Sequence, residues 1–481
     1  MVTEARSVGL VFKDGKLADA SRHVVMLLLT WSRCAMTRLR EPALHVLGIV
    51  LVAALAMIGL RVLRSGRPNV VLICIDALRA DATSPYNPQI RHTPNLQSLA
   101  DEGTVVPLAL SQSSWTTESI ASVMTGRLPG EVAAGQGPLS IAESETTLPE
   151  LLRQRGYATA AVVANSTLTE ADGFAQGFDW FSNESLGPGL PERLTRWLTD
   201  HRRKPFFLYL HYMQAHHPYR WPEKFEAMVG PLPPHIRDMR SKEIVENLVW
   251  SLRAGEGHVT GEEARYLRRC YDAAVATADE AVGAVFSYLK AHDLWSPTLV
   301  ILFADHGEEF AEHGMLQHSA DLYREEIRVP LLLKLPRGGR QRTPVHFARN
   351  LDIAPTLAEI AGLRRRMEWR GVSLFSKQAP EIALAELGVR THPDPFVASR
   401  TTHWRAVYLS SGESLVQHGH TGKLGLYGAA DPEQQHDVAD QHPDRVRELA
   451  HLLPTARARG GTTAPLSETQ KRTLRSLGYM R

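Results

Sequence analysis

Short, almost continuous apolar runs alternate along the chain with longer segments in which apolar residues recur at helical spacing. The runs have the length and composition of strands buried on both faces, and they lie at 69–76, 158–165, 204–212, 298–305 and 329–336. The helical segments lie at 93–103, 147–156, about 262–291 and 350–362. This alternation predicts an α/β fold, with a mostly parallel central sheet sandwiched by helices.

The pattern changes from about Pro380, where short polar and apolar alternations such as HWRAVYLSS and ESLVQHG replace the earlier runs. This change predicts a small C-terminal antiparallel addition. We therefore expect a catalytic domain over 68–380, a subdomain over 381–454, and a tail over 455–481 that ends in a short amphipathic helix.

An apolar segment at 43–62 follows a short cytoplasmic or leader segment over 1–42, of which residues 1–25 are polar. Its apolar character between Ala43 and Leu60 is interrupted only by His45, and its length is near the minimum for spanning a bilayer. We expect an uncleaved transmembrane anchor that places the catalytic domain outside the cytoplasm, in the periplasm or the extracellular space. A cleaved signal peptide with a long leader is the alternative.

Composition and charge exclude several classes of protein. The 481 residues include 54 Lys and Arg against 52 Asp and Glu, a net charge of +2, so there is no basic footprint for nucleic acid. Three widely spaced cysteines exclude a disulfide framework and a cysteine zinc site. The 21 histidines are more informative, because several fall in clusters.

Three of the predicted strands end in side chains that can bind a metal. Asp76 ends the first, His216 and His217 follow another, and Asp305 and His306 end a third. Ligands of open α/β sheets bind at the carboxyl ends of the strands, and carboxylate with imidazole suits a divalent cation. The alternative is that Asp76 and Asp305 only cap the turns that follow them.

Residues 113–126 read SSWTTESIASVMTG, in which hydroxyl side chains precede an apolar helical turn. Glu118 comes early in that turn and Gly126 can end it, so we expect a helix whose free N–H groups favour an anion. A hydroxyl at this helix start can serve as a nucleophile if a metal lowers its pKa. Plain N-capping is the alternative.

At this point the chain resembles the sulfatase family of the alkaline phosphatase superfamily over about 68–480. The motifs occur in the family's order, among them RPNVVLICIDALRAD, HTPNLQSLADEG, SSWTTESIASVMTGRLP, ADHGEEFAEHG and DIAPTLAEIAG. The resemblance implies a metal bound by Asp76, Thr116, Asp305 and His306. It also implies that Thr116 is the nucleophile, that His216 protonates the leaving group, and that His318 replaces a catalytic lysine.

The chain also departs from the family's pattern. The C/S-x-P-x-R motif that directs formylglycine formation is replaced by Thr116–Ile120, so formylglycine should not form. Ala77 stands where many sulfatases have a second ligand aspartate, and His306 replaces an asparagine. The family's lysine and histidine of the next substrate strand fall near Ala164 and Ser166. This pattern resembles the threonine-nucleophile branch that moves phosphate groups on lipids and polymers.

We therefore expect a membrane-anchored, metal-dependent hydrolase of sulfate or phosphate esters with a threonine nucleophile. Its substrate would be a small-molecule, lipid or polysaccharide ester. An imidazole ligand favours one Mn²⁺ or Zn²⁺ over Ca²⁺ or Mg²⁺. Two other functions stay open: a phosphoryl-group transferase acting on envelope lipids or polymers, and an inactive sulfatase-like binding protein.

Several further side chains lie close to these motifs in the sequence. A second metal would need extra ligands, for which His217 and His313 are candidates, although His313 fits a supporting loop position better. His211, inside a strand, is interpreted as a core histidine, and Glu308 and Glu309 are expected near the metal loop or in solvent. If His318 grips the ester as a cation, its ordinary pKa of about 6.5 predicts activity that falls as pH rises.

Overall fold

The protein is described by a computed structural model that covers residues 67–132, 140–339, 345–388 and 403–455 and the helical positions 468, 471, 472 and 475. Its centre is a seven-stranded sheet in the order β2-β11-β7-β1-β6-β4-β5. Five neighbouring strands are parallel, and at one edge β11 pairs antiparallel with β7 and β2 pairs antiparallel with β11. The parallel strands are β1 (Asn69–Ile75), β4 (Ala158–Val163), β5 (Trp180–Asn183), β6 (Phe206–Tyr212) and β7 (Thr298–Phe303); the edge strands are β11 (Leu331–Lys334) and β2 (Thr104–Val105).

The register of the three central strands brings their carboxyl ends to one edge of the sheet. Every residue of β1, β6 and β7 is buried, as their continuous apolar sequences require. Cys74 of β1 lies opposite His211 of β6 on one side and Phe303 of β7 on the other. The residues that follow β1 and β7 therefore emerge side by side.

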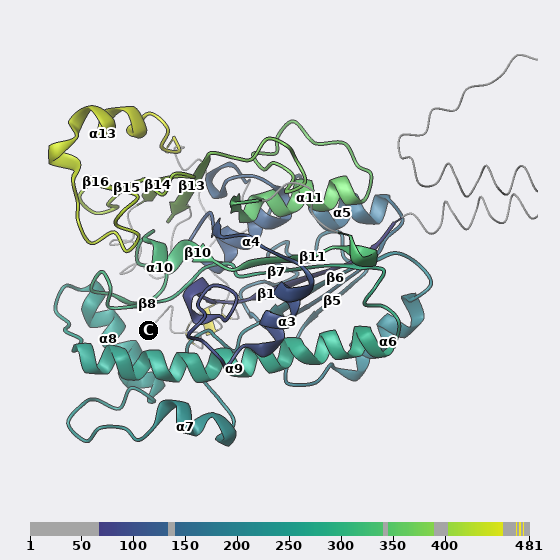
Figure 1. The fold of residues 1–481 in the computed structure, drawn as a ribbon, viewed down its shortest axis with the longest axis horizontal. Helices are drawn as coiled ribbons and strands as arrows, with labels where there is room; N and C mark the ends of the chain where they lie inside the picture. The colour runs from purple at the N-terminus through teal and green to yellow at the C-terminus, as the bar shows by residue number, and fades with distance from the viewer. Residues whose placement is uncertain are drawn as a thin grey trace, which may run out of the picture. The chain divides into compact units, whose positions relative to one another are not determined.

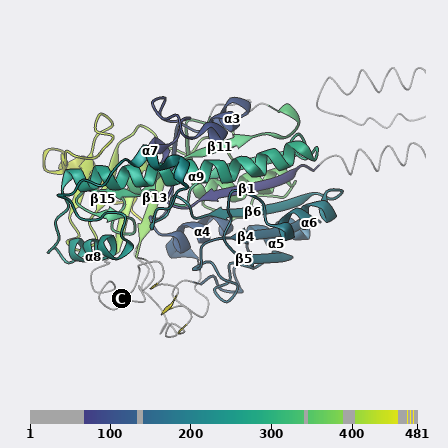
Figure 2. The same cartoon turned by 90° about the horizontal axis from the view of Figure 1, so that it is seen from below.

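Helices cover both faces of this sheet (Figures 1 and 2). One face carries α9 (Gly261–Ala291), α3 (Pro94–Glu102) and α6 (Glu192–His201). The other carries α4 (Thr116–Thr125), α5 (Leu148–Gln154) and α11 (Ile353–Ile360). The long helix α9 begins at a capping box, in which Thr260 accepts from the N–H of Glu263 and Glu263 accepts from the N–H of Thr260. Two shorter helices, α7 (Glu226–Val229) and α8 (Lys242–Arg253), precede it.

The C-terminal addition is an antiparallel sheet of four strands, β13 (Ile382–Leu387), β14 (Trp404–Leu409), β15 (Ser414–Gln417) and β16 (Leu424–Tyr427). A helix, α13 (Pro443–Ala450), follows it. One face of the sheet packs in a hydrophobic cluster that includes Trp115 and Tyr323 of the larger domain. Because Trp115 immediately precedes α4, the addition also supports the start of that helix.

Three small elements lie between the two sheets. A three-stranded sheet joins β3 (Leu108–Leu110), β10 (Arg328–Val329) and β12 (Phe347–Arg349). A hairpin pairs β8 (Glu309–Phe310) with β9 (Leu316–Gln317), and the short helix α10 (Arg324–Ile327) leads into β10. None of these was predicted from the sequence, because segments of two to four residues are too short to show a period.

The predicted architecture is confirmed in its central sheet and its C-terminal antiparallel sheet. The run at 329–336 forms the antiparallel strand β11, which the apolar pattern alone could not orient. The expected anchor at 43–62 lies outside the described residues, as does most of the tail over 455–481. Among the helices that the structure describes, none is both long enough and apolar enough to cross a membrane.

Candidate active site

Asp76 follows β1 directly and is fully buried. Its Oδ2 accepts hydrogen bonds from Asn165 Nδ2 at 2.7 Å and from His211 Nε2 at 2.9 Å. Burial opposes its ionisation, but the charge of His216 and the hydrogen bond from His211 outweigh burial and hold the pKa of Asp76 below its usual range. Its Oδ1 has no hydrogen-bond partner among the described residues. A buried carboxylate with one unsatisfied oxygen is available as a metal ligand.

Asp305 lies beside Asp76, at the end of β7. Its Oδ1 accepts from the backbone N–H groups of Ala77 at 3.2 Å and His306 at 3.0 Å, whereas its Oδ2 has no partner within the described part of the chain. Ala77 takes a left-handed conformation with φ 59°, which is unusual for alanine and aims its N–H at Asp305. Burial and then the charge of Asp76 raise the pKa of Asp305. A cation between the two carboxylates would remove that cost.

His306 turns one ring nitrogen toward both carboxylates. Its Nδ1 lies 2.9 Å from the carbonyl oxygen of Gly307, so Nδ1 carries the proton and Nε2 presents its lone pair. That Nε2 lies 3.4 Å from Asp76 Oδ1 and 3.5 Å from Asp305 Oδ2. These two oxygens are the unsatisfied ones described above. Two carboxylate oxygens and an imidazole lone pair that face each other in the dry interior are the donor set of a divalent cation.

Thr116 completes this group from the other side, as the first residue of α4. Its Oγ1 lies 3.2 Å from His306 Nε2 and 3.5 Å from Asp76 Oδ2. The helix forms as the sequence predicted, with Glu118 in the first turn and Gly126 at its end in the left-handed conformation. Because Thr116 is the first residue of α4, the positive end of the helix dipole favours an oxyanion at its hydroxyl.

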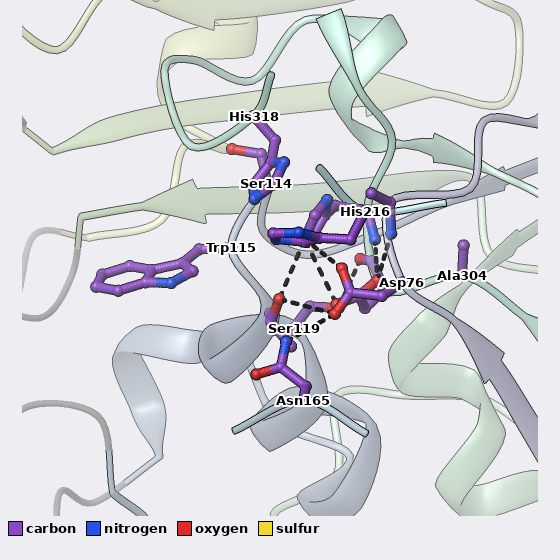
Figure 3. A network of polar contacts seen from close by, with 12 residues as sticks. Asp76, Ser114, Trp115, Ser119, Asn165, His216, Ala304 and His318 are labelled. Atoms are coloured by element: carbon purple, nitrogen blue, oxygen red, sulfur yellow. Dashed lines mark hydrogen bonds and ion pairs between the residues drawn. The ribbon is translucent and has the colours of Figure 1, made fainter. Parts of the chain in front are cut away.

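Two further histidines, His216 and His318, lie next to Asp76 and the other candidate metal donors (Figure 3). The ring centroid of His318 lies 4.2 Å from that of His306 and 4.8 Å from that of His216. The Nδ1 of His216 donates to the carbonyl oxygen of His217. His217 is buried and packs its ring against Tyr219 at 5.4 Å, so it supports the loop.

The environment of His318 disfavours the cation that its ordinary pKa suggested. Its Nδ1 lies 2.7 Å from Glu308 Oε1, and both side chains are almost fully buried. Burial, and then the charges of His306 and His216, lower the pKa of His318, while burial raises the pKa of Glu308. We therefore expect His318 to act as a neutral ring. Glu308 is not in solvent, because it also accepts from the hydroxyl of Tyr219 at 2.8 Å.

Three residues that the sequence analysis did not place in the site support its ligands. His211 is more than a core histidine, since it joins Asp76 to the hydroxyl of Tyr209, which lies 2.7 Å from His211 Nδ1. Ser119 donates to the carbonyl oxygen of Asp305 at 2.7 Å and so ties α4 to the end of β7. Asn165 reaches Asp76 from the side opposite His318 (Figure 3). Only its place as the last residue of a predicted strand could have indicated it.

The profile of the sulfatase family matches residues 68–363 of this chain, which is more than half of its length and includes every site residue described above. The chain belongs to the sulfatase family. It is therefore a sulfatase-type hydrolase of the class that acts on sulfuric and phosphoric esters.

Individual family members are similar at low identity. The choline-sulfatase of Rhizobium meliloti is 26% identical over 410 residues, which cover 72% of this chain and 78% of that protein. A multifunctional alkaline phosphatase superfamily protein of Trinickia caryophylli is 24% identical, over 62% of this chain and 74% of its own. The phosphonate monoester hydrolase of Agrobacterium radiobacter shares the fold with a TM-score of 0.63 at 19% identity, over 80% of this chain and 94% of that one.

Asn165 offers a test of how far the supporting residues tune this sulfatase-type site. Asn165→Ala removes the 2.7 Å hydrogen bond to Asp76 Oδ2, so we expect metal affinity to fall about 10–100-fold, with a similar loss of kcat/KM. Titration of the metal-depleted protein with Mn²⁺ or Zn²⁺ measures the affinity. Asn183→Ala is the matched control, because Asn183 donates to the carbonyl groups of Asn165 and Leu168 in the same loop without contacting Asp76. Equal losses in both variants would contradict the prediction.

Proposed function

We propose that this protein is a metal-dependent hydrolase of phosphate or sulfate esters that uses Thr116 as its nucleophile. The observation that carries the proposal is the position of His306 Nε2, which lies 3.2–3.5 Å from Thr116 Oγ1, Asp76 Oδ1 and Asp305 Oδ2. The two carboxylate oxygens have no other partner in the described residues. The hydroxyl is thus the one nucleophile of this donor set.

Asp76, Thr116, Asp305 and His306 would hold the cation of this sulfatase-type site, and the imidazole favours Mn²⁺ or Zn²⁺. When bound, the cation supplies Lewis acidity, which lowers the pKa of the Thr116 hydroxyl and polarises an ester oxygen. The carboxylates support this assignment, because burying two of them side by side is costly without a positive charge.

The side chains divide the reaction between them. Thr116 loses its hydroxyl proton to solvent and its Oγ1 attacks the phosphorus or sulfur atom in line with the leaving oxygen. The bond to that oxygen breaks, and the group is left as an ester of Thr116. Proton donation to the departing alkoxide is assigned to His216, whose ring lies beside those of His318 and His306 at the donor set. Water then attacks the same phosphorus or sulfur atom, which breaks the bond to Oγ1 and restores the threonine.

The substrate class is the next part of the proposal. Relatives and structural neighbours include a choline-sulfatase and a phosphonate monoester hydrolase, so both sulfur and phosphorus esters are candidates here. We expect a singly charged phosphodiester to be accepted at least as well as a doubly charged monoester. The reason is that the arginine, lysine and histidine with which the family grips sulfate are replaced at the matching positions, Ile120, Ala164 and Ser166.

The proposal is tested by a screen of chromogenic esters with the Mn²⁺- or Zn²⁺-loaded full chain. The substrates are 4-nitrophenyl sulfate, 4-nitrophenyl phosphate, bis(4-nitrophenyl) phosphate and 4-nitrophenyl phenylphosphonate. We expect the diester to be turned over at a rate no lower than that of the phosphate monoester. The free acid formed from each ester should be released in an amount equal to that of nitrophenol. A strong monoester preference would contradict the expected charge selectivity.

The same assay separates the two alternative functions. A phosphoryl-group transferase would release nitrophenol faster when an acceptor alcohol such as glycerol is added, and the group would be recovered on that alcohol. An inactive binding protein would retain its cation and turn over none of the four esters. A hydrolase releases nitrophenol at a rate that the acceptor does not change.

We also propose that the segment 43–62 anchors the enzyme in a membrane, with the catalytic domain in the periplasm or outside the cell. The support is the apolar composition of that segment alone. Membrane fractions of cells that produce the full chain or a chain starting at residue 67 provide the test. We expect the full chain in the membrane fraction and accessible to protease from outside the cytoplasm. Recovery of the full chain in the soluble fraction would contradict the anchor.

A further inference from the structure

A second buried group of acidic side chains lies next to the metal site without taking part in it. Glu309 comes from β8, Asp321 from the loop after β9, and Glu326 from α10. One oxygen of each lies within 4.8 Å of one oxygen of the other two. Their exposed fractions are 0%, 3% and 0%. Three carboxylates this close together and this dry cannot all ionise without a compensating positive charge.

Backbone N–H groups satisfy only part of this cluster. Glu309 Oε1 accepts from the N–H groups of His313 at 2.7 Å and Met315 at 2.8 Å, and Glu326 Oε2 accepts from that of Ser319 at 3.0 Å. The other oxygens, Glu309 Oε2 and Glu326 Oε1, have no hydrogen-bond partner within the described residues. Two fully buried carboxylates that each leave one oxygen unsatisfied point to a ligand between them.

A positively charged side chain next to the cluster, His313, already forms an ion pair with a fourth carboxylate, that of Glu325. His313 Nδ1 is paired with Glu325, and His313 Nε2 lies 3.0 Å from the carbonyl oxygen of Gln434. Both ring nitrogens therefore donate, so the ring is charged, in agreement with a pKa raised to about 9, against the effect of burial, by Glu325. This charge balances Glu325.

Other basic groups around the cluster are directed elsewhere. Arg324 donates to the carbonyl oxygens of Pro432 and Gly412, and Arg79 pairs with Asp81 and Glu312. In the described residues, no lysine, arginine or histidine forms an ion pair with Glu309, Asp321 or Glu326. Burial and the neighbouring carboxylates raise the pKa of each of these three groups, that of Asp321 to about 7.

We propose that Glu309, Asp321 and Glu326 bind a second divalent cation, separate from the one at Asp76. Three carboxylates that offer only oxygen form the shell that Ca²⁺ prefers, in contrast to the mixed oxygen and nitrogen donors of the first site. His313 also acts on Asp321 and lowers its pKa, but not enough to offset burial and the neighbouring carboxylates. The cation supplies the further positive charge that the three carboxylates need, and it satisfies the two unpartnered oxygens.

The second cation would fix the loops on both sides of the active site. Ser319, which donates to Glu326, follows His318 directly, and Ser319 Oγ bonds to the carbonyl oxygen of Ser114 at 3.3 Å. Ser114, two residues before Thr116, in turn donates to the carbonyl oxygen of Asp321 at 2.6 Å. On the third side, the N–H of Gly307 bonds to the carbonyl oxygen of Glu326, so the cluster is braced against the segment that carries His306.

Metal content separates the two sites. The full chain is stripped with a chelator, reloaded with Ca²⁺ alone, passed through a desalting column and analysed for bound Ca²⁺ per chain. The analysis uses an Asp305→Ala background, in which the first site has lost a ligand. We expect about one Ca²⁺ per chain in Asp305→Ala and none in Asp305→Ala with Glu326→Gln. Asp305→Ala with Glu312→Gln is the control and should keep its Ca²⁺, because Glu312 lies in the same loop but pairs with Arg79.

Thermal unfolding gives a second readout that does not depend on activity. In the Asp305→Ala background we expect Ca²⁺ in excess to raise Tm by about 5 °C, and Glu326→Gln to remove that response. If the carboxylates are instead held by shared protons, Glu326→Gln relieves repulsion, so Tm rises and does not respond to Ca²⁺. That result, or Asp305→Ala without bound Ca²⁺, would overturn the proposal. Both outcomes are independent of whether any ester is hydrolysed.

Discussion

Replacing Thr116 by alanine is expected to lower kcat by about 10³-fold or more, because the proposed covalent nucleophile is lost. The fold should be retained, since α4 is buried along its whole length and alanine is a good helix former. One of four metal donors is removed, so we expect a lower metal affinity, with the ion still bound at saturating concentration. Steady-state kinetics with the ester that the screen identifies, at saturating Mn²⁺ or Zn²⁺, measure the effect.

The neighbouring threonine provides the matched control. Thr117 is fully buried, and its Oγ1 has no hydrogen-bond partner in the described part of the chain, so Thr117→Val keeps the shape and should leave kcat within a few-fold. Adjacent helix positions do not share a face, so Thr117 points away from the metal group. Thr116→Ser retains a hydroxyl and should recover part of the lost rate. An active Thr116→Ala beside a dead Thr117→Val would show that the nucleophile has been assigned to the wrong residue.

Removing the metal is expected to have an effect of similar size. Asp305→Ala deletes the unsatisfied Oδ2 that faces His306 Nε2 at 3.5 Å and leaves Asp76 with half of the negative charge of the pair. Loss of a Lewis acid worth several kcal/mol corresponds to a fall in kcat/KM of about 10³-fold. Treatment of the wild type with a chelator should give the same loss.

Metal replacement distinguishes this explanation from simple unfolding. Activity of the stripped wild type should return with Mn²⁺ or Zn²⁺ and return less with Ca²⁺, because one of the donors is an imidazole. The Asp305→Ala variant should not recover at the same metal concentrations, although its Tm shows that it is folded. Full activity of the stripped protein in the presence of chelator would contradict a metal-dependent mechanism.

The sequence by itself determined five of the seven strands of the central sheet and most of its helices, because long buried strands and amphipathic helices leave clear periods, whereas β2 and β5 are too short to do so. It also placed Asp76, Asp305 and His306 at strand ends and Thr116 at a helix start. These positions depend on the local rule that parallel strands share one carboxyl edge. The ordered motifs, rather than any single one, supplied the family.

The tertiary structure alone decided which side chains support those ligands. Asn165 and His211 come from different strands, and nothing in their local sequence shows that both donate to Asp76 Oδ2. His318 shows the same limit, because the ordinary pKa of histidine predicted a cation that titrates near neutral pH. Its burial and the charges of His306 and His216 lower its pKa instead.

The acidic cluster was hidden for the same physical reason. Glu309, Asp321 and Glu326 are separated along the chain and look like ordinary surface acids, and only the packing of β8 against α10 buries them together. Gly307 allows this approach, because a Cβ there would come within 2.0 Å of the carbonyl oxygen of Glu325. The hydrophobic period of a segment predicts whether that segment is buried. Which carboxylates from three separate segments come into contact depends on long-range packing. That packing is what the sequence did not reveal.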